Sequence, residues 1–145
     1  MTENKKIKNA SPLEYDGISF KSKLEKMAYQ TLKENNLPVE YEPQKFIIWE
    51  GFKPTVPFYN KDTKTRMLRQ ETKKIIDISY TPDFIVRYNS YLVILELKGF
   101  ENNVYPLKKK IFRKWLEENE PKSIYFEIYT KKQLLQAIDI IKNLE

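Results

Sequence analysis

The sequence predicts one α/β domain in which helices flank a mixed central sheet. Two neighbouring runs of β-branched and aromatic residues, over 75–87 and 91–98, are typical of paired strands. Apolar residues with a helical period lie before and after this pair, and a further strand and helix follow. The order is helix, three meandering strands, helix, strand, helix. A right-handed crossover through the second helix would place the last strand in the same sheet.

The first helix is predicted to begin after Ser22, which is a suitable N-cap residue, and to end at Asn35-Asn36. Its expected core face consists of Leu24, Met27, Ala28, Thr31 and Leu32. A strand over 39–49 follows. Pro43 interrupts it, so this strand is expected at a sheet edge or a bulge.

The second helix is predicted to begin at Tyr105, with Pro106 in its first turn. A strand over 123–129 and a helix over 131–144 complete the order. The apolar residues expected to face the core are Leu107, Ile111, Phe112 and Trp115 in the second helix, and Leu134, Leu135, Ile138 and Ile141 in the third.

Two segments depart from the pattern of a compact core. Residues 1–12 are polar and rich in Lys and Asn, which predicts a flexible basic tail before a single domain over 13–145. Residues 51–74 have no clear periodicity and many cations, so we expect a basic β-arm inserted in the domain. The arm either contacts a DNA backbone or is a solvated charged hairpin.

Composition excludes several kinds of chemistry. The 145 residues include no Cys and no His, which removes thiolate-ligated zinc and the usual general base. Three glycines leave no phosphate-binding glycine loop, so no nucleotide cofactor is expected. No membrane span or apolar signal region is visible, so a soluble, cytoplasmic protein is expected. The net charge of +6 suits a polyanionic partner.

The paired runs bring acidic residues together. If Asn89 and Ser90 form a two-residue turn, counting outward places Asp83 opposite Glu96. Lys98 projects from the same face as Glu96, about 7 Å further along the strand. Two facing carboxylates repel each other unless a cation compensates them. This arrangement indicates a Mg²⁺ site, for which Mn²⁺ is a substitute, and phosphodiester cleavage. The alternative is a surface hairpin with ordinary charges at its open end.

The sequences Phe20-Lys-Ser-Lys-Leu-Glu25, Tyr41-Glu-Pro-Gln44-Lys-Phe46, Tyr80-Thr-Pro-Asp83-Phe84 and Glu96-Leu97-Lys98-Gly99 together resemble the PD-(D/E)XK nuclease superfamily. Within it they are similar to a phage and prophage endonuclease family that is related to Holliday junction resolvases. The resemblance covers roughly residues 15 to 118. It implies a restriction-endonuclease-like αβββαβ core and a phage or prophage protein acting in a bacterial host cell.

The resemblance also implies roles for individual residues. Asp83, Glu96 and the Leu97 carbonyl would hold the metal, Lys98 would assist the reaction, and Glu25 would be a third acid. Glu25 is equally explained as part of a capping box with Ser22. Lys108 is either an accessory phosphate contact or a snorkelling surface lysine. The residues expected to contact DNA are Gln44, Lys64, Arg66, Arg69, Lys73, Lys74, Lys108, Lys109, Lys110 and Arg113.

The function expected from these residues is Mg²⁺-dependent endonuclease activity that favours branched DNA, in phage recombination, replication or packaging. The resemblance adds a homodimer as a candidate assembly. One alternative is a transposon-end nuclease subunit of the TnsA type. Another is a non-catalytic module that binds nucleic acid on the same fold.

Overall fold

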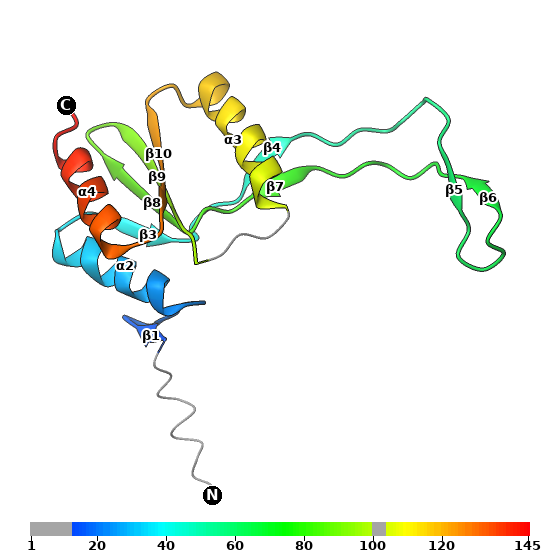
Figure 1. Ribbon diagram of the computed structural model, residues 1–145. Helices are drawn as coiled ribbons and strands as arrows, with labels where there is room; N and C mark the ends of the chain where they lie inside the picture. The colour runs from blue at the N-terminus through cyan, green and yellow to red at the C-terminus, as the bar shows by residue number, and fades with distance from the viewer. Residues whose placement is uncertain (1–12, 100–103) are drawn as a thin grey trace, which may run out of the picture.

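A computed structural model of the chain describes residues 13–99 and 104–145, so the tail expected over 1–12 lies outside the described residues. Its central sheet has the strand order β10-β9-β8-β3 (Figure 1). Strands β3 (Val39–Tyr41), β8 (Phe84–Tyr88) and β9 (Tyr91–Leu97) form an antiparallel meander, and β10 (Ser123–Ile128) is parallel to β9. The prediction of a mixed α/β sheet is confirmed.

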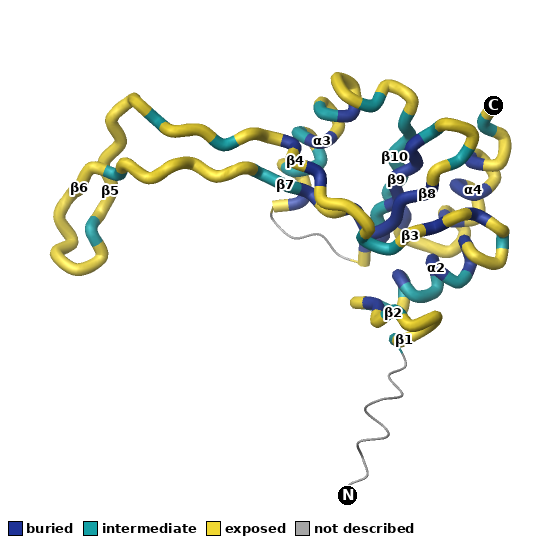
Figure 2. The backbone as a smooth tube through the Cα atoms, turned by 180° about the vertical axis from the view of Figure 1, so that it is seen from behind, coloured by how far each residue is buried: buried dark blue, intermediate teal, exposed yellow. Residues whose placement is uncertain are grey.

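Helices cover both faces of this sheet (Figures 1 and 2). Helices α2 (Lys23–Glu34) and α4 (Lys131–Lys142) share one core with the strand residues Val93 and Leu95. Helix α3 (Tyr105–Asn119) shares the other core with Leu92 and Ile94. Alternate residues of a strand point to opposite faces, so β9 is buried on both sides.

Two predicted core residues are wrong. Leu107 is 59% exposed and Leu135 is 47% exposed, whereas Leu116 and Ala137 are buried on the respective helices. In each case the apolar stripe is rotated by a part of a turn from the expected face. None of the three described helices has the length and apolar run that a membrane span requires.

The β8–β9 hairpin has the predicted register. Tyr88 pairs with Tyr91, and Ile85 pairs with Ile94. Asn89 and Ser90 have φ angles of 49° and 72°, as a two-residue turn of type I′ requires.

The long predicted strands are divided. The run over 39–49 separates at Pro43 into β3 and β4 (Phe46–Trp49), and the run over 75–87 separates at Pro82 into β7 (Ile78–Tyr80) and β8. Strands β4 and β7 pair in a separate two-stranded sheet, because proline ends one ladder and lets the chain turn into another. A short hairpin of β1 (Glu14–Tyr15) and β2 (Ile18–Ser19) was not predicted.

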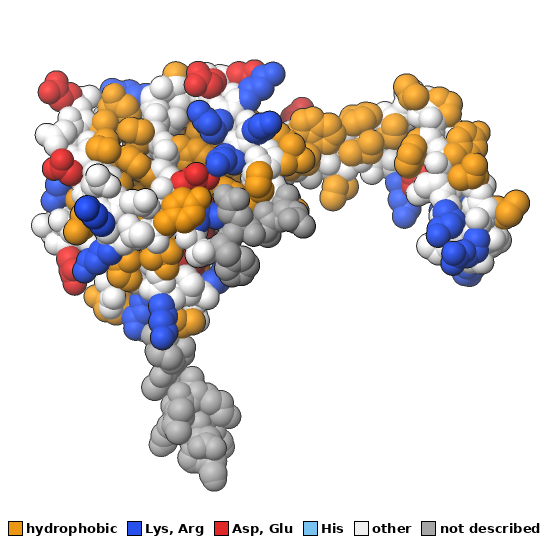
Figure 3. Space-filling view, viewed as in Figure 1, with side chains coloured by type: hydrophobic (Ala, Val, Ile, Leu, Met, Phe, Trp, Pro, Cys, Tyr) orange, Lys and Arg blue, Asp and Glu red, His pale blue; other side chains and the backbone are white. Residues whose placement is uncertain are grey.

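The insertion forms a protruding arm (Figure 1). Strands β5 (Tyr59–Lys61) and β6 (Leu68–Gln70) pair near its tip, and an isolated bridge joins Phe52 to Ile75 at its root. Gly51 lies against the opposite chain, where an added Cβ would be 2.0 Å from the Ile75 carbonyl oxygen. Figure 3 shows an apolar shaft and a tip with clustered cations.

Candidate active site

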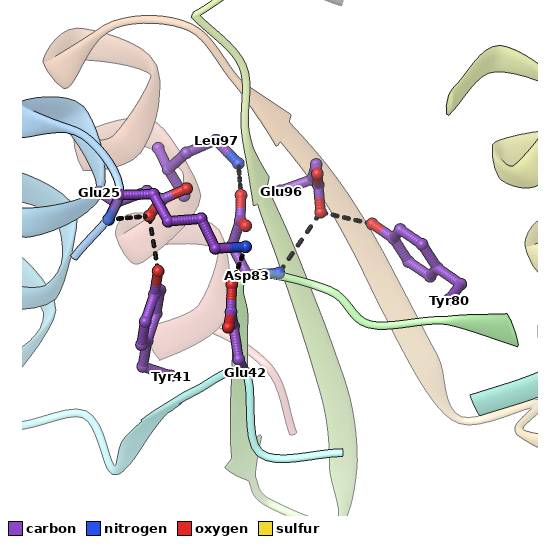
Figure 4. Close-up of polar contacts among 8 residues, drawn as sticks. Glu25, Tyr41, Glu42, Tyr80, Asp83, Glu96 and Leu97 are labelled. Carbon is purple, nitrogen blue, oxygen red and sulfur yellow. Dashed lines mark hydrogen bonds and ion pairs between the residues drawn. The ribbon is translucent and has the colours of Figure 1, made fainter. Parts of the chain in front are cut away.

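Asp83 and Glu96 meet where β8 begins and β9 ends. The backbone N–H of Leu97 donates to Asp83 Oδ2 at 2.8 Å, and that of Asp83 lies 3.4 Å from Glu96 Oε1 (Figure 4). Asp83 is only 7% exposed. The tight turn therefore places the two carboxylates side by side, as the register implied.

Burial controls the electrostatics of this pair. Loss of solvation raises the pKa of Asp83 to about 8, and the negative charges of Glu96 and Glu25 add to the effect. Burial also raises the pKa of Glu96, against the opposing effects of a Tyr80 hydrogen bond and the Lys98 charge. The pair thus resists carrying two negative charges unless more positive charge is supplied.

Glu25 approaches from the first turn of α2, on the other face of the sheet. Its backbone N–H donates to Ser22 Oγ at 3.1 Å, which is the N-cap bond that the sequence predicted. Its Oε1 accepts from the Lys21 backbone at 3.1 Å and from the Tyr41 hydroxyl at 2.8 Å (Figure 4). The return bond of a capping box would go to Ser22. Here it goes one residue earlier.

The three carboxylates share a pattern. Asp83, Glu96 and Glu25 each have one oxygen held by hydrogen bonds, while the second oxygen receives none from the residues that the structure describes. Open carboxylate oxygens at a buried, mutually repelling pair suit a hard divalent cation. Within the same residues, however, no group of three or more His, Cys, Asp or Glu could hold a metal together. The donors that fit are Asp83 and Glu96.

Lys98 lies beside the pair rather than between the two acids. It is 7% exposed, and its Nζ lies 3.7 Å from the centroid of the Tyr105 ring. Lys98, Glu96 and Lys108 line one pocket of about 430 Å³. The structure therefore brings Lys108 to the same pocket, where a cation could meet a bound phosphate.

A family model described as "Protein of unknown function (DUF1064)" matches residues 5–134 of the chain. The protein belongs to the DUF1064 family. No curated protein and no solved structure gives a significant match.

The other cations predicted on α3 of this DUF1064 protein do not form one cluster. Lys109 Nζ is 2.8 Å from Glu127 Oε2, and Arg113 lines the same cleft beside β10. Lys110 and Lys114 line a groove beside β4 instead. These cations of α3 are therefore divided between two clefts.

Gln44 and the arm cations lie apart from the carboxylates. Gln44 is exposed, and its side-chain oxygen accepts from Arg87 at 3.5 Å. Lys64, Arg66 and Arg69 are at the arm tip, where Arg69 pairs with Asp62 at 3.3 Å, and Lys73 and Lys74 are on the shaft. The arm is the strongly cationic projection that the sequence predicted, although its tip is remote from the carboxylates (Figure 1).

Sequence reasoning missed the tyrosines that support the site. The hydroxyl of Tyr80 donates to Glu96 Oε1 at 2.5 Å, and Tyr105 carries the ring beneath Lys98. The sequence does show that Tyr125 and Glu127 alternate on one face of a strand. Only the structure shows that Glu127 pairs with Glu96 in the parallel register. Without that register, nothing in the sequence assigned these residues to the Glu96 side of the DUF1064 sheet.

Proposed function

We propose that this protein is a metal-dependent DNA endonuclease of the PD-(D/E)XK type. The observation that carries the proposal is the buried pair Asp83 and Glu96, in which each carboxylate keeps one oxygen open beside Lys98. The chain order α2, β3, β8, β9, α3, β10 supports the same proposal, since it matches an αβββαβ core. Burial of unpaired acids destabilises a fold. Such acids are therefore typical of functional sites.

Each residue then has a definite task. Asp83 and Glu96 would hold Mg²⁺, which would supply Lewis-acid activation of water and of the phosphodiester. Lys98, which lines the same pocket, directs positive charge at the negative charge that develops on the phosphoryl oxygens. Glu25 adds negative charge near Asp83 from the side of α2 and so strengthens the attraction of the site for a cation.

DNA is held mainly by its backbone. Lys108 extends the pocket with a second ammonium. Arg66 lies between β5 and β6 on the protruding arm, so it would contact a separate part of the duplex or a second duplex. None of the described helices stands free of the core as a protruding recognition helix would, since α2, α3 and α4 all pack on the sheet. We therefore propose selection of branched DNA by shape, in a phage or prophage setting.

The test compares labelled four-way junction with linear duplex of matched sequence, in Mg²⁺ and in EDTA. We expect Mg²⁺-dependent cleavage that is faster on the junction. Asp83→Ala and Lys98→Ala should abolish cleavage while DNA binding in Ca²⁺ is kept, and Lys131→Ala on α4 serves as the control. Tight DNA binding without cleavage by the unmodified protein would instead indicate a non-catalytic binding module.

A further inference from the structure

A continuous chain of hydroxyl groups lies behind the carboxylate pair, on the α3 side of the sheet. Glu96 is 2.5 Å from the Tyr80 hydroxyl, and Tyr80 is 3.2 Å from the hydroxyl of Tyr125. Tyr125 is 2.8 Å from the Tyr105 hydroxyl, which in turn lies 2.7 Å from Glu127 Oε2. The chain therefore has a carboxylate at each end and three tyrosines between them.

The two carboxylates fix the direction of the bonds at the ends of this chain. With both carboxylates charged, three hydroxyl protons must serve four oxygen–oxygen contacts. The two ends take the protons of Tyr80 and Tyr105, since a charged acceptor makes the stronger bond. Tyr125 has one proton for two hydroxyl neighbours, Tyr105 at 2.8 Å and Tyr80 at 3.2 Å, and the longer contact is the weaker one. Tyr80 is thus committed to Glu96.

The same tyrosines hold Lys98. Its ammonium lies 3.7 Å from the centre of the Tyr105 ring, on a side chain that is 7% exposed. A cation over an aromatic face is attracted by the ring quadrupole, most strongly where water is excluded. The hydroxyl of Tyr105 is bonded to β10 through Tyr125 and Glu127, so the ring is fixed against the sheet.

We propose that Tyr80, Tyr125 and Tyr105 are positioning residues that hold Glu96 of β9 and Lys98, which directly follows this strand, in place. Tyr80 occupies Oε1 of Glu96 and so leaves Oε2 for a divalent cation, and the ring of Tyr105 keeps the Lys98 ammonium at the same pocket. The inference rests on the proposed function, because it assigns the metal to Glu96. It adds three residues that touch neither metal nor DNA.

The first test measures Mn²⁺ affinity by calorimetry, without DNA. Tyr80→Phe removes only the hydroxyl and should weaken Mn²⁺ binding about 10-fold or more, the usual effect of losing a partner of a metal ligand. Tyr88→Phe removes a hydroxyl from the far end of β8 and should leave the affinity unchanged. Tyr80→Phe binding Mn²⁺ as tightly as the unmodified protein would overturn the inference alone. A Mn²⁺ affinity that Glu96→Gln does not reduce would overturn the proposed function as well.

The second test separates the ring of Tyr105 from its hydroxyl. Tyr105→Phe keeps the ring beneath Lys98 but loses the hydroxyl that fixes it, so kcat should fall by only about 3-fold, whereas Tyr105→Leu should lower kcat about 10-fold or more with KM for DNA unchanged. Equal losses in the two variants would contradict a role for the ring.

A spectroscopic measurement covers the case in which Tyr105→Leu does not fold. The ε-methylene protons of Lys98 should show an upfield ring-current shift in NMR spectra of the unmodified protein and of Tyr105→Phe, because the ammonium lies over the ring. Random-coil shifts for these protons in both proteins would overturn the inference without reference to cleavage.

Discussion

Asp83 is an acid whose burial opposes folding in the absence of metal. Its pKa is raised from 3.8 to about 8, so between these values the folded chain keeps a proton that the unfolded chain releases. Stability therefore falls as pH rises through this window, and the penalty is absent below the unfolded pKa. Glu96 shifts in the same direction and adds to the slope.

We predict that the metal-free protein, unfolded with urea in EDTA, loses stability from pH 5 to pH 8. The slope from Asp83 is at most about 1.4 kcal/mol per pH unit. Asp83→Asn should flatten the profile, and Asp139→Asn, at an exposed position of α4, should leave it unchanged. Mg²⁺ should stabilise the protein more at pH 8 than at pH 5, because it binds the charged carboxylates. A rise in stability from pH 5 to pH 8 in EDTA would contradict the buried-acid interpretation.

At the residue scale, the sequence predicted those contacts that follow from a turn between neighbouring strands. Asn89-Ser90 set the hairpin register, which in turn placed Asp83 beside Glu96. The tyrosines around them could not be predicted in this way. Their positions depend on how β10 aligns with β9 and where α3 crosses the sheet, and both are contacts between residues distant in the sequence.

Among the elements, the arm has the least support from packing. Val56, Met67 and Leu68 on it are 69–79% exposed, and its strands are joined by a short pairing near the tip and one bridge at the root. A two-stranded ribbon without a packed face is marginally stable in water. A bound polyanion would neutralise the cationic tip and restrict its motion.

Neutralising the tip tests whether the arm binds DNA. The double variant Arg66→Gln/Arg69→Gln should weaken binding to all sequences alike and reduce the log-log salt slope by about one to two units, at about 0.9 per phosphate contact. Lys131→Gln/Lys132→Gln on α4 makes the same charge change away from the arm and should leave the slope intact. Salt titration of DNA affinity decides the matter. An unaltered slope in the arm variant would indicate that the arm is a solvated charged hairpin that does not bind DNA.

A second prediction concerns the root of the arm. Gly51→Ala places a methyl group 2.0 Å from the Ile75 carbonyl oxygen and 2.6 Å from the Ile76 carbonyl carbon, so the two chains must separate there. We expect trypsin to cut the arm faster at Lys73 and Lys74, while the far-UV spectrum of the core is preserved. Gly99→Ala is the matched control, since among the described residues its Cβ would meet nothing within 4 Å. Equal cleavage rates in the two variants would show that the root tolerates the methyl group.

The elements themselves were predictable where one signal dominates. Ser22 capped α2 and Pro106 opened α3 as expected. The expected strand over 75–87 failed because Pro82 changes the sheet to which the chain belongs, and a strand propensity contains no information about its pairing partner.

For the whole molecule, the carboxylate pair and the arm belong to different sheets. The carboxylates lie at one end of the central sheet, and the arm leaves the domain from β4 and returns to β7, in a different sheet. Replacing residues 53–74 with a short Asn-Gly turn should therefore keep Mn²⁺ affinity and the folded core while weakening binding to a four-way junction. Loss of the Mn²⁺ site in this deletion variant would show that the arm supports the carboxylates.

The bridge between Phe52 and Ile75 closes the arm at its root, so the residues beyond it can be replaced by an insertion of another length. Its two ends are already joined by a pair of backbone hydrogen bonds of 2.8 Å, so insertions of other lengths can be accepted beyond that point without moving Asp83 or Glu96. Loop closure depends only weakly on length, which makes such exchanges thermodynamically inexpensive. Proteins that share this core can thus vary in the length and sequence of this insertion while the β8–β9 hairpin stays as it is.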